Sequence, residues 1–271
     1  MAVVALLMGL GIMLNWKKTD LNKIKKWQFI PLALAVFLGS LLPGIISDSY
    51  SISAAITIFL GSWVIFASIS DVVRKTQNAK SFWVGFRRLT LSYKGMAIAH
   101  IGFAFTLLGA GINTIYSDQK DIRLAVGDTY ESAGYQYELN DVSNVRGPNY
   151  SSNIAEIRVI RNEKVLSILT PEKRKYFSGG NEMTEASVDV GVLRDLYVAL
   201  GESLGGTEWA VRIHYKPLVR WIWFGAFLMG LGGIVAIIDK RYQGRRRKVA
   251  PASSSETVKG EDIKEPVLAS S

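Results

Sequence analysis

The chain has two histidines, the side chains best suited to carrying a proton or ligating a metal near neutral pH. His100 lies about one turn inside an apolar run, close to the end that basic residues flank. An ionisable group within a membrane helix is costly and is by default a functional candidate. A neutral imidazole can ligate haem iron axially or relay a proton. The alternative is a histidine that hydrogen-bonds a neighbouring helix or reaches the interface, and the spacing alone leaves both open.

Small residues recur along the same apolar run at alternating steps of four and three. They are Gly95, Ala99, Gly102, Thr106, Gly109 and Asn113. Such a stripe lets another helix or a flat ligand approach closely. His100 borders this stripe.

The remaining polar candidates have ordinary explanations. His214 stands on the polar face of an alternating segment, so we expect an exposed surface histidine. Trp221 and Trp223, together with Arg220, match an interfacial anchor. Four further charged residues near predicted strand ends indicate a solvated face: Arg194, Asp195, Glu202 and Arg212.

Several classes of chemistry are excluded by composition. The chain has no cysteine, which rules out disulfides and thiol chemistry of its own. It contains no cluster with metal-ligand spacing, no glycine-rich phosphate loop, no nucleophile elbow and no hydrolytic triad. No catalytic residue is therefore assigned from the sequence.

Apolar residues gather in blocks long enough to cross a ~30 Å hydrocarbon layer, which takes about 20 helical residues. The formal net charge of +9 is concentrated at the ends of these blocks, which indicates a membrane and not a nucleic acid as partner. We predict an α-helical integral membrane protein with about five transmembrane helices and an inserted extracytoplasmic all-β domain, a small barrel or sandwich. The predicted helices are 1–14, 27–46, 52–69 and 96–116 within the region 1–116, and 217–239; the β domain is 117–216 and a basic, disordered tail is 240–271.

Lysine and arginine define the predicted orientation. They are dense in the stretches 15–26, 70–95 and 240–248, whereas the turn 47–51 contains none. These basic stretches share one side in an up-and-down path, and the positive-inside rule makes that side cytoplasmic. The first block is short and runs inward with nothing before it, so we expect the tail end of a longer helix in a larger membrane protein, truncated or encoded separately.

The region 117–216 has the alternation and turn signals of short strands. The clearest alternation places Trp209, Val211, Ile213 and Tyr215 on one face. The predicted strands are Ile122–Val126, Tyr135–Val145, Ile154–Arg161, Val165–Tyr176, Glu185–Val190, Asp195–Leu200 and Trp209–Lys216.

Five stretches are similar, in order, to stretches of one known family: Lys94–Gly102 (KGMAIAHIG), Met183–Ala186 (MTEA), Arg194–Glu202 (RDLYVALGE), Trp209–Arg212 (WAVR) and Lys216–Trp223 (KPLVRWIW). They resemble the CcmF/NrfE family of cytochrome c-type biogenesis haem lyases, in its histidine-bearing transmembrane helix and its carboxy-terminal periplasmic domain. The resemblance runs from near Met1 to about Tyr242 and concerns only the carboxy-terminal part of the family.

The resemblance implies a function. Family members receive haem from the chaperone CcmE and attach it to the CXXCH motif of apocytochrome c, and CcmH is the thiol-handling partner. They also hold a haem b in the membrane between two histidines. His100 matches one of them, so the resemblance implies that His100 ligates the haem b iron; His214 matches no ligand. The implied location is the bacterial cytoplasmic (inner) membrane, with the β domain in the periplasm and the carboxy terminus in the cytoplasm.

The departures from the family are equally informative. The tryptophan-rich WWD loop, its two flanking histidines and the second membrane histidine belong to the amino-terminal half of the family and do not occur in this chain. We therefore expect half of a haem b site and a docking domain, inactive in haem attachment without the amino-terminal half. The alternatives are a non-catalytic scaffold subunit of the maturation complex and a transporter half. The second is weaker because the helices offer few polar groups besides His100 and Asn113.

Overall fold

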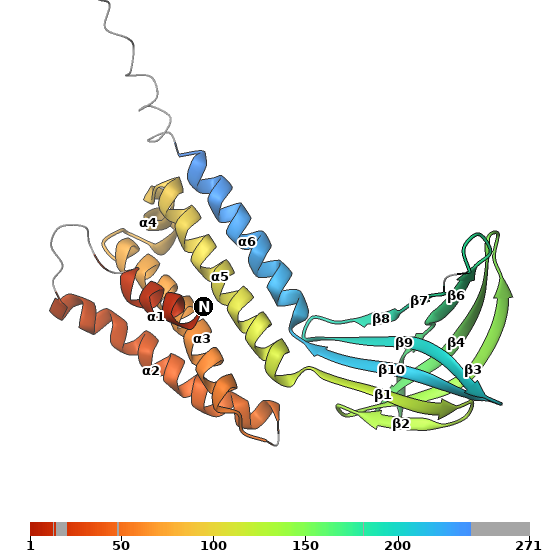
Figure 1. Cartoon of the computed structure of the whole chain (residues 1–271). Coiled ribbons are helices and arrows are strands. Elements are labelled where there is room, and N and C mark those ends of the chain that lie inside the picture. The colour runs from red at the N-terminus through yellow and green to blue at the C-terminus, as the bar shows by residue number, and fades with distance from the viewer. Residues whose placement is uncertain (13, 15–20, 48, 181, 240–271) are drawn as a thin grey trace, which may run out of the picture.

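The computed structural model describes residues 1–12, 14, 21–47, 49–180 and 182–239. It consists of a helical part and a β-sandwich that extends sideways from one end of the helices (Figure 1). The chain passes from the helical part into the sandwich and returns, so the sandwich is an insertion between two long helices. The predicted tail 240–271 lies outside the described residues.

Among the described residues the helical part contains six helices: α1 (Ala2–Gly11), α2 (Leu21–Ile46), α3 (Ile52–Thr76), α4 (Phe82–Arg88), α5 (Leu91–Tyr116) and α6 (Val219–Ile237). In the part of the chain that the structure describes, α2, α3, α5 and α6 are long and apolar enough to cross a membrane. Helix α1 has ten residues and is about 15 Å long, which is half the thickness of the hydrocarbon layer. The described residues thus form a helical bundle with four helices of membrane-spanning length, where about five were expected, and one short apolar helix.

Hydroxyl side chains cap the starts of α3 and α5. Ser51 Oγ accepts a hydrogen bond from Ala54 N at 3.3 Å, and Thr90 Oγ1 accepts one from Tyr93 N at 3.2 Å. Each cap satisfies one of the free N–H groups in the first turn of its helix. The short helix α4, which the sequence analysis did not predict, is capped in the same way by Ser81.

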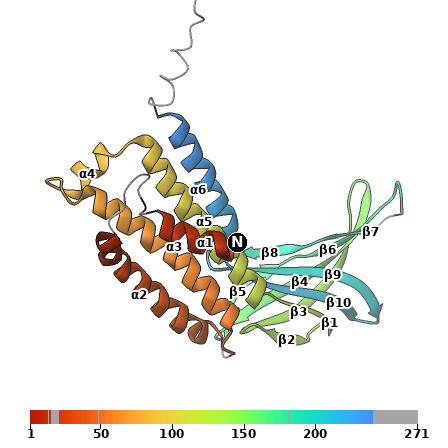
Figure 2. The ribbon, with the colours of Figure 1, turned by 60° about the vertical axis from the view of Figure 1, so that its left-hand side comes forward.

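Helix α3 is the centre of the bundle, because α1, α2 and α5 all pack against it. Helix α6 packs along α5 over most of its length, and the two views agree on this arrangement (Figures 1 and 2). A cluster of buried residues joins α1, α3 and α5, and it contains Ala5, Leu60, Trp63, Val64 and Ala104.

In the part of the chain that the structure describes, the sandwich has ten strands: β1 (Asp118–Ala125), β2 (Thr129–Ser132), β3 (Tyr135–Arg146), β4 (Tyr150–Arg161), β5 (Lys164–Leu169), β6 (Glu172–Tyr176), β7 (Glu182–Glu185), β8 (Ser187–Val190), β9 (Arg194–Gly205) and β10 (Glu208–Pro217). One sheet has the order β1-β10-β9-β8, and the other has the order β2-β3-β4-β6-β7 with β5 also paired to β4. All described strand pairs are antiparallel. The expectation of an all-β domain is confirmed, and its form is a sandwich.

The core of the sandwich comes from alternate residues of facing strands. Ala155, Ile157 and Val159 of β4 are fully buried, and Val211 and Ile213 of β10 are buried opposite them. Trp209 and Tyr215 pack against the same core, as their alternation with Val211 and Ile213 predicts.

Two predicted strands are each divided in the structure. Val165–Tyr176 separates into β5 and β6 at Pro171, which has no N–H group for a ladder. Pro171 O accepts a hydrogen bond from Ala155 N at 3.0 Å, so β4 bridges the break. Glu185–Val190 separates at Ala186, where the chain passes from one sheet to the other.

Candidate functional site

The small-residue stripe of α5 is the surface on which α6 packs. A Cβ atom on Gly102 would lie 2.7 Å from Gly225 O, and one on Gly109 would lie 2.8 Å from Ile222 N. Thr106 Oγ1 donates a hydrogen bond of 3.4 Å to Ile222 O across the same seam. Of the two occupants that the sequence left open, the structure shows a helix.

His100 lies on a different face of α5, which the neighbouring turns identify. Ala97 and Ala104, three residues before and four residues after it, are both buried. Ala104 belongs to the cluster shared with α1 and α3, and Phe103 and Leu107 pack against that cluster. Because residues three and four apart share a helix face, His100 is directed toward the side of α5 that meets α3 and α1.

The His100 side chain is partly buried, and its Nδ1 atom is enclosed with no hydrogen-bond partner among the described residues. An enclosed polar atom without a partner costs about 1–3 kcal/mol. Among the described residues no group of three or more His, Cys, Asp or Glu side chains could hold a metal ion.

A buried ionic cluster that the sequence did not predict joins α3 to α5. Its residue on α5, Tyr93, lies two turns before His100. Asp71 of α3 is 0% exposed, and its carboxylate accepts hydrogen bonds from Tyr93 Oη at 2.6 Å and Arg74 Nε at 3.1 Å. Lys75 Nζ lies 3.6 Å from the carboxylate and 3.9 Å from the centre of the Tyr93 ring. Since Tyr93 precedes His100 by seven residues, this cluster fixes α3 against the His100 face of α5.

A second tie closes the same end of the α5–α6 pair. Asp239, which is 6% exposed, follows α6, and its Oδ2 atom accepts a hydrogen bond of 2.9 Å from Ser92 N in the first turn of α5. A carboxylate at a helix amino terminus is favoured by the free N–H groups there. Helix α5 is therefore held on two sides near its amino terminus, before His100.

His214 is more buried than predicted. It stands on β10 opposite Tyr197 of β9, with the two ring centres 5.7 Å apart, and both ring nitrogens are enclosed without a hydrogen-bond partner in the described structure. Burial, with the charges of Lys216 and Arg212 as smaller contributions, lowers the pKa of His214. The expectation of an exposed surface histidine was wrong, because the cross-strand tyrosine covers the ring.

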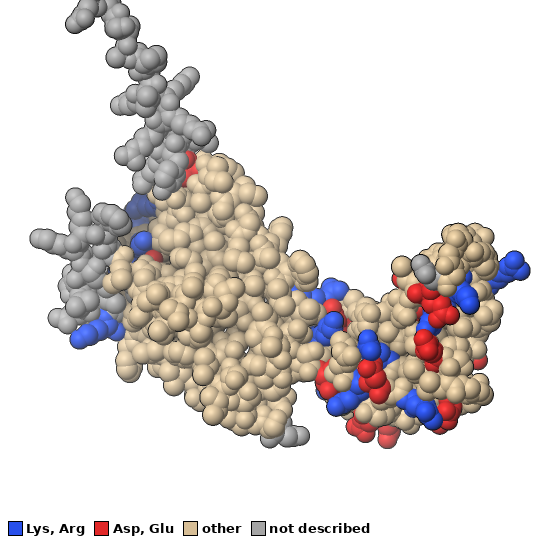
Figure 3. All heavy atoms as spheres, viewed as in Figure 1, with Lys and Arg blue, Asp and Glu red and all other residues tan. Residues whose placement is uncertain are grey.

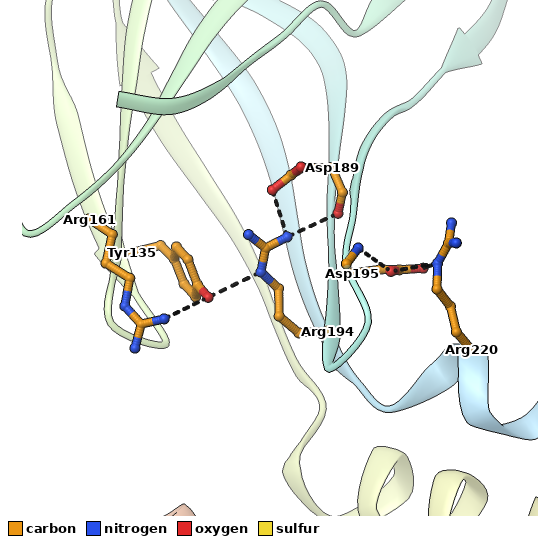
Figure 4. A network of polar contacts seen from close by, with 7 residues as sticks. Tyr135, Arg161, Asp189, Arg194, Asp195 and Arg220 are labelled. Carbon is orange, nitrogen blue, oxygen red and sulfur yellow. Dashed lines mark hydrogen bonds and ion pairs between the residues drawn. The ribbon is translucent and has the colours of Figure 1, made fainter. Parts of the chain in front are cut away.

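The prediction of a solvated charged face is correct for two residues and wrong for two. Glu202 is 80% exposed at its side chain, and Arg212 is exposed and paired with Asp121. Arg194 and Asp195 belong instead to a partly buried network, which Figure 4 shows.

This network connects the two sheets of the sandwich to α6. Arg194 Nε donates a hydrogen bond of 3.1 Å to Tyr135 Oη, and its NH1 lies 2.6 Å from the Asp189 carboxylate. Asp195 pairs with Arg220 in the first turn of α6 at 3.2 Å. Burial disfavours the charged form of Arg194, but the hydrogen bonds with Tyr135 and Asp189 outweigh it and raise the pKa of the guanidinium.

The bundle and the inserted sandwich define a class, a polytopic membrane protein with a β-sandwich between two spanning helices. A family described as "CcmF C-terminal beta-sandwich" matches residues 115–217. The chain is 41% identical over 247 residues to the cytochrome c-type biogenesis protein CcmF of Pseudomonas fluorescens, covering 90% of this chain and 36% of that protein. It is 35% identical over 255 residues to CcmF of Escherichia coli strain K12, covering 94% of this chain and 38% of that protein.

A solved structure of the cytochrome c haem lyase CcmF has the same fold, with a TM-score of 0.70 at 19% sequence identity over 88% of this chain and 38% of that one. The chain belongs to the CcmF family and corresponds to its carboxy-terminal part. It spans a little over a third of the length of these relatives.

Proposed function

We propose that the chain acts in cytochrome c maturation as the carboxy-terminal part of a haem lyase, in which His100 ligates a membrane haem b. The observation that carries the proposal is the place of His100, a partly buried histidine in α5, a helix long and apolar enough to span a membrane. In a chain of the CcmF family, a histidine in such a helix fits an axial haem ligand. The second ligand comes from outside this chain.

Contacts on two sides hold the helix that carries His100. The α5–α6 seam fixes one side of the helix, and the contact between Tyr93 and Asp71 fixes the side that meets α3. When bound, the haem supplies a one-electron redox centre. A ligand on a helix held on two sides keeps a constant orientation, which favours a defined reduction potential.

The distribution of charge supports a cytoplasmic location for the end of the bundle that bears Arg74, Lys75, Arg87 and Arg88. In Figure 1 the sandwich leaves the bundle at the opposite end. We therefore place the helical bundle in the bacterial inner membrane and the sandwich in the periplasm. There it docks apocytochrome c, the haem chaperone CcmE or the thiol-handling CcmH, alongside the amino-terminal half of the family.

The haem assignment is tested with the two histidines as a matched pair. His100→Ala and His214→Ala are made in the chain co-expressed with, or fused to, the amino-terminal half, and the reduced haem spectrum of the purified membrane complex is recorded. We expect His100→Ala to lose the haem b bands and His214→Ala to retain them, because only His100 lies in a spanning helix. Retention of haem b in His100→Ala would refute the assignment.

The same pair of variants separates the haem lyase from a non-catalytic scaffold, with the yield of mature cytochrome c as the second measurement. A scaffold predicts an unchanged yield in His100→Ala and a lost yield when the sandwich is disrupted. If His100 is a haem ligand, His100→Ala should lower both the bound haem b and the yield of mature cytochrome c.

A further inference from the structure

The turn between β8 and β9 presents two bare apolar side chains. Val192 is 77% exposed and Leu193 is 65% exposed, whereas Gly191 and Arg194 on either side are partly covered. Exposing apolar side chains to water is unfavourable, so the exposure of this turn calls for an explanation.

The backbone of this turn is fixed to the start of α6. Trp221 Nε1 donates a hydrogen bond of 3.0 Å to Val192 O, and Leu218 N donates one of 2.9 Å to Leu193 O. The Asp195 carboxylate accepts a hydrogen bond of 3.1 Å from Gly191 N and also pairs with Arg220 (Figure 4). The turn is therefore held at the level of the first turn of α6.

Where α6 crosses a bilayer, that level is the membrane interface. Helix α6 is long and apolar enough to span a bilayer, and its first turn contains Arg220 and Trp221, the residue types that occupy the headgroup region. Farther along α6, Trp223 and Phe227 are 74% and 66% exposed. The apolar surface of α6 thus begins beside the turn.

The apolar surface also continues from the turn into the sandwich. Val188 and Val190 of β8 are exposed, while Asp189 between them turns inward to Arg194. Strand β5, which lies against β8, exposes Val165, Leu166 and Ile168. In Figures 1 and 2, β8 lies along the side of the sandwich nearest α6.

We propose that Val188, Val190, Val192 and Leu193, which we call the interfacial edge, rest in the headgroup region of the bilayer that α6 crosses. Lipid is the occupant that the observations favour, because the edge is continuous with the exposed face of a spanning helix and is fixed at the height of its interfacial anchor. The contact adds a second point of attachment, so the sandwich keeps one tilt toward the membrane. The proposal requires α6 to cross a membrane and does not depend on haem.

The test uses the absence of cysteine from the chain. Leu193→Cys is labelled with the environment-sensitive dye NBD in phosphatidylcholine nanodiscs, with and without lipids that carry a spin label near the headgroup. Leu204→Cys is the matched control, since Leu204 is 45% exposed and lies near the far end of β9, the strand that follows the turn. We expect a blue-shifted emission and a loss of fluorescence with spin-labelled lipid at position 193, and neither effect at position 204.

Two results would overturn the proposal. If the dye at position 193 emits at the same wavelength as the dye at position 204, the edge does not reach the bilayer. Blue-shifted emission without quenching by the lipid means that a protein surface covers the edge instead. Near-UV circular dichroism of both labelled variants establishes that the sandwich is folded in each.

A second measurement tests which residues make the attachment. With the dye at Val188→Cys, the added substitutions Val192→Ser and Leu193→Ser remove the apolar tip while leaving the backbone hydrogen bonds to α6 possible. We expect less quenching at position 188 by the spin-labelled lipid. Unchanged quenching would show that the tip does not hold the edge in the membrane.

Discussion

The helical part and the sandwich are organised in opposite ways. The sandwich buries large side chains such as Tyr137, Leu139 and Ile157 and carries many charges of both signs on its surface (Figure 3). The helical part shows an almost uncharged surface in the same view. Its large side chains, Phe37 and Trp223 among them, face outward, while glycine lies at the contact between α5 and α6.

This difference follows from the two solvents. In water, burying apolar surface yields roughly 25 cal/mol per Å², so the largest side chains belong inside. Lipid offers no such gain between helices, and close backbone contact and polar ties hold them together instead. In this chain those roles belong to Gly102 in the seam and to Asp71 beneath His100.

The largest effect is expected where a large side chain leaves the core of the sandwich. Ile157→Ala removes a fully buried side chain, and a substitution of this type costs about 2–5 kcal/mol because it leaves a cavity. Urea unfolding followed by near-UV circular dichroism measures the loss. The control is Ile168→Ala on β5, whose side chain is 55% exposed and whose change should stay within about 0.5 kcal/mol. Equal costs at the two positions would contradict the assigned core.

In the helical part, adding a single carbon should be the damaging change. Gly102→Ala places a Cβ atom 2.7 Å from Gly225 O, and overpacking of this kind costs about 1–3 kcal/mol. Thermal unfolding in detergent micelles provides the measurement. Gly230→Ala is the matched control on α6, because its Cβ atom meets nothing within 4 Å and should be neutral or slightly stabilising. If both variants behave alike, the α5–α6 seam is looser than described.

The buried carboxylate offers a way to sharpen the comparison. Tyr93→Phe removes the hydroxyl that donates to Asp71, and a hydrogen bond to a charged group contributes about 1.5–3 kcal/mol. Tyr116→Phe on the same helix removes an enclosed hydroxyl with no hydrogen-bond partner in the described structure, so it should cost nothing or stabilise. The same micelle unfolding assay compares them. A costlier Tyr116→Phe would show that the Asp71 cluster is not what fixes α5.

Local patterns in the sequence predicted the parts of this structure that depend on local periodicity. The alternation of Trp209, Val211, Ile213 and Tyr215 correctly placed these residues on one face, which packs into the core, since a strand has a period of two. The predicted block 52–69 stopped before Asp71, because a charge normally ends an apolar run. Helix α3 continues to Thr76 in the structure, since Tyr93 and Arg74 satisfy the carboxylate.

Contacts between distant segments could not be predicted in this way. The tie between Asp71 and Tyr93 joins two helices, and Tyr197 reaches His214 from a neighbouring strand. Neither partner is visible in the periodicity of a single segment. The candidate His100 was found because its chemistry is unusual for its surroundings, which is a local signal, whereas the face of α5 that it occupies depends on α3 and α1.

The smallest effect concerns the pH dependence of the sandwich. Burial lowers the pKa of His214 in the folded state, so the unfolded chain binds its proton more readily. By linkage, the free energy of unfolding falls as the pH drops below the unfolded value of about 6.5, and it levels off below the folded pKa. His214→Gln should remove this part of the slope and leave every other titrating group in place. Urea unfolding of both proteins between about pH 7.5 and pH 5 compares the slopes in the window where an unperturbed histidine titrates. Parallel curves would mean that the ring of His214 gains a proton as freely when folded as when unfolded, and that Tyr197 does not shield it.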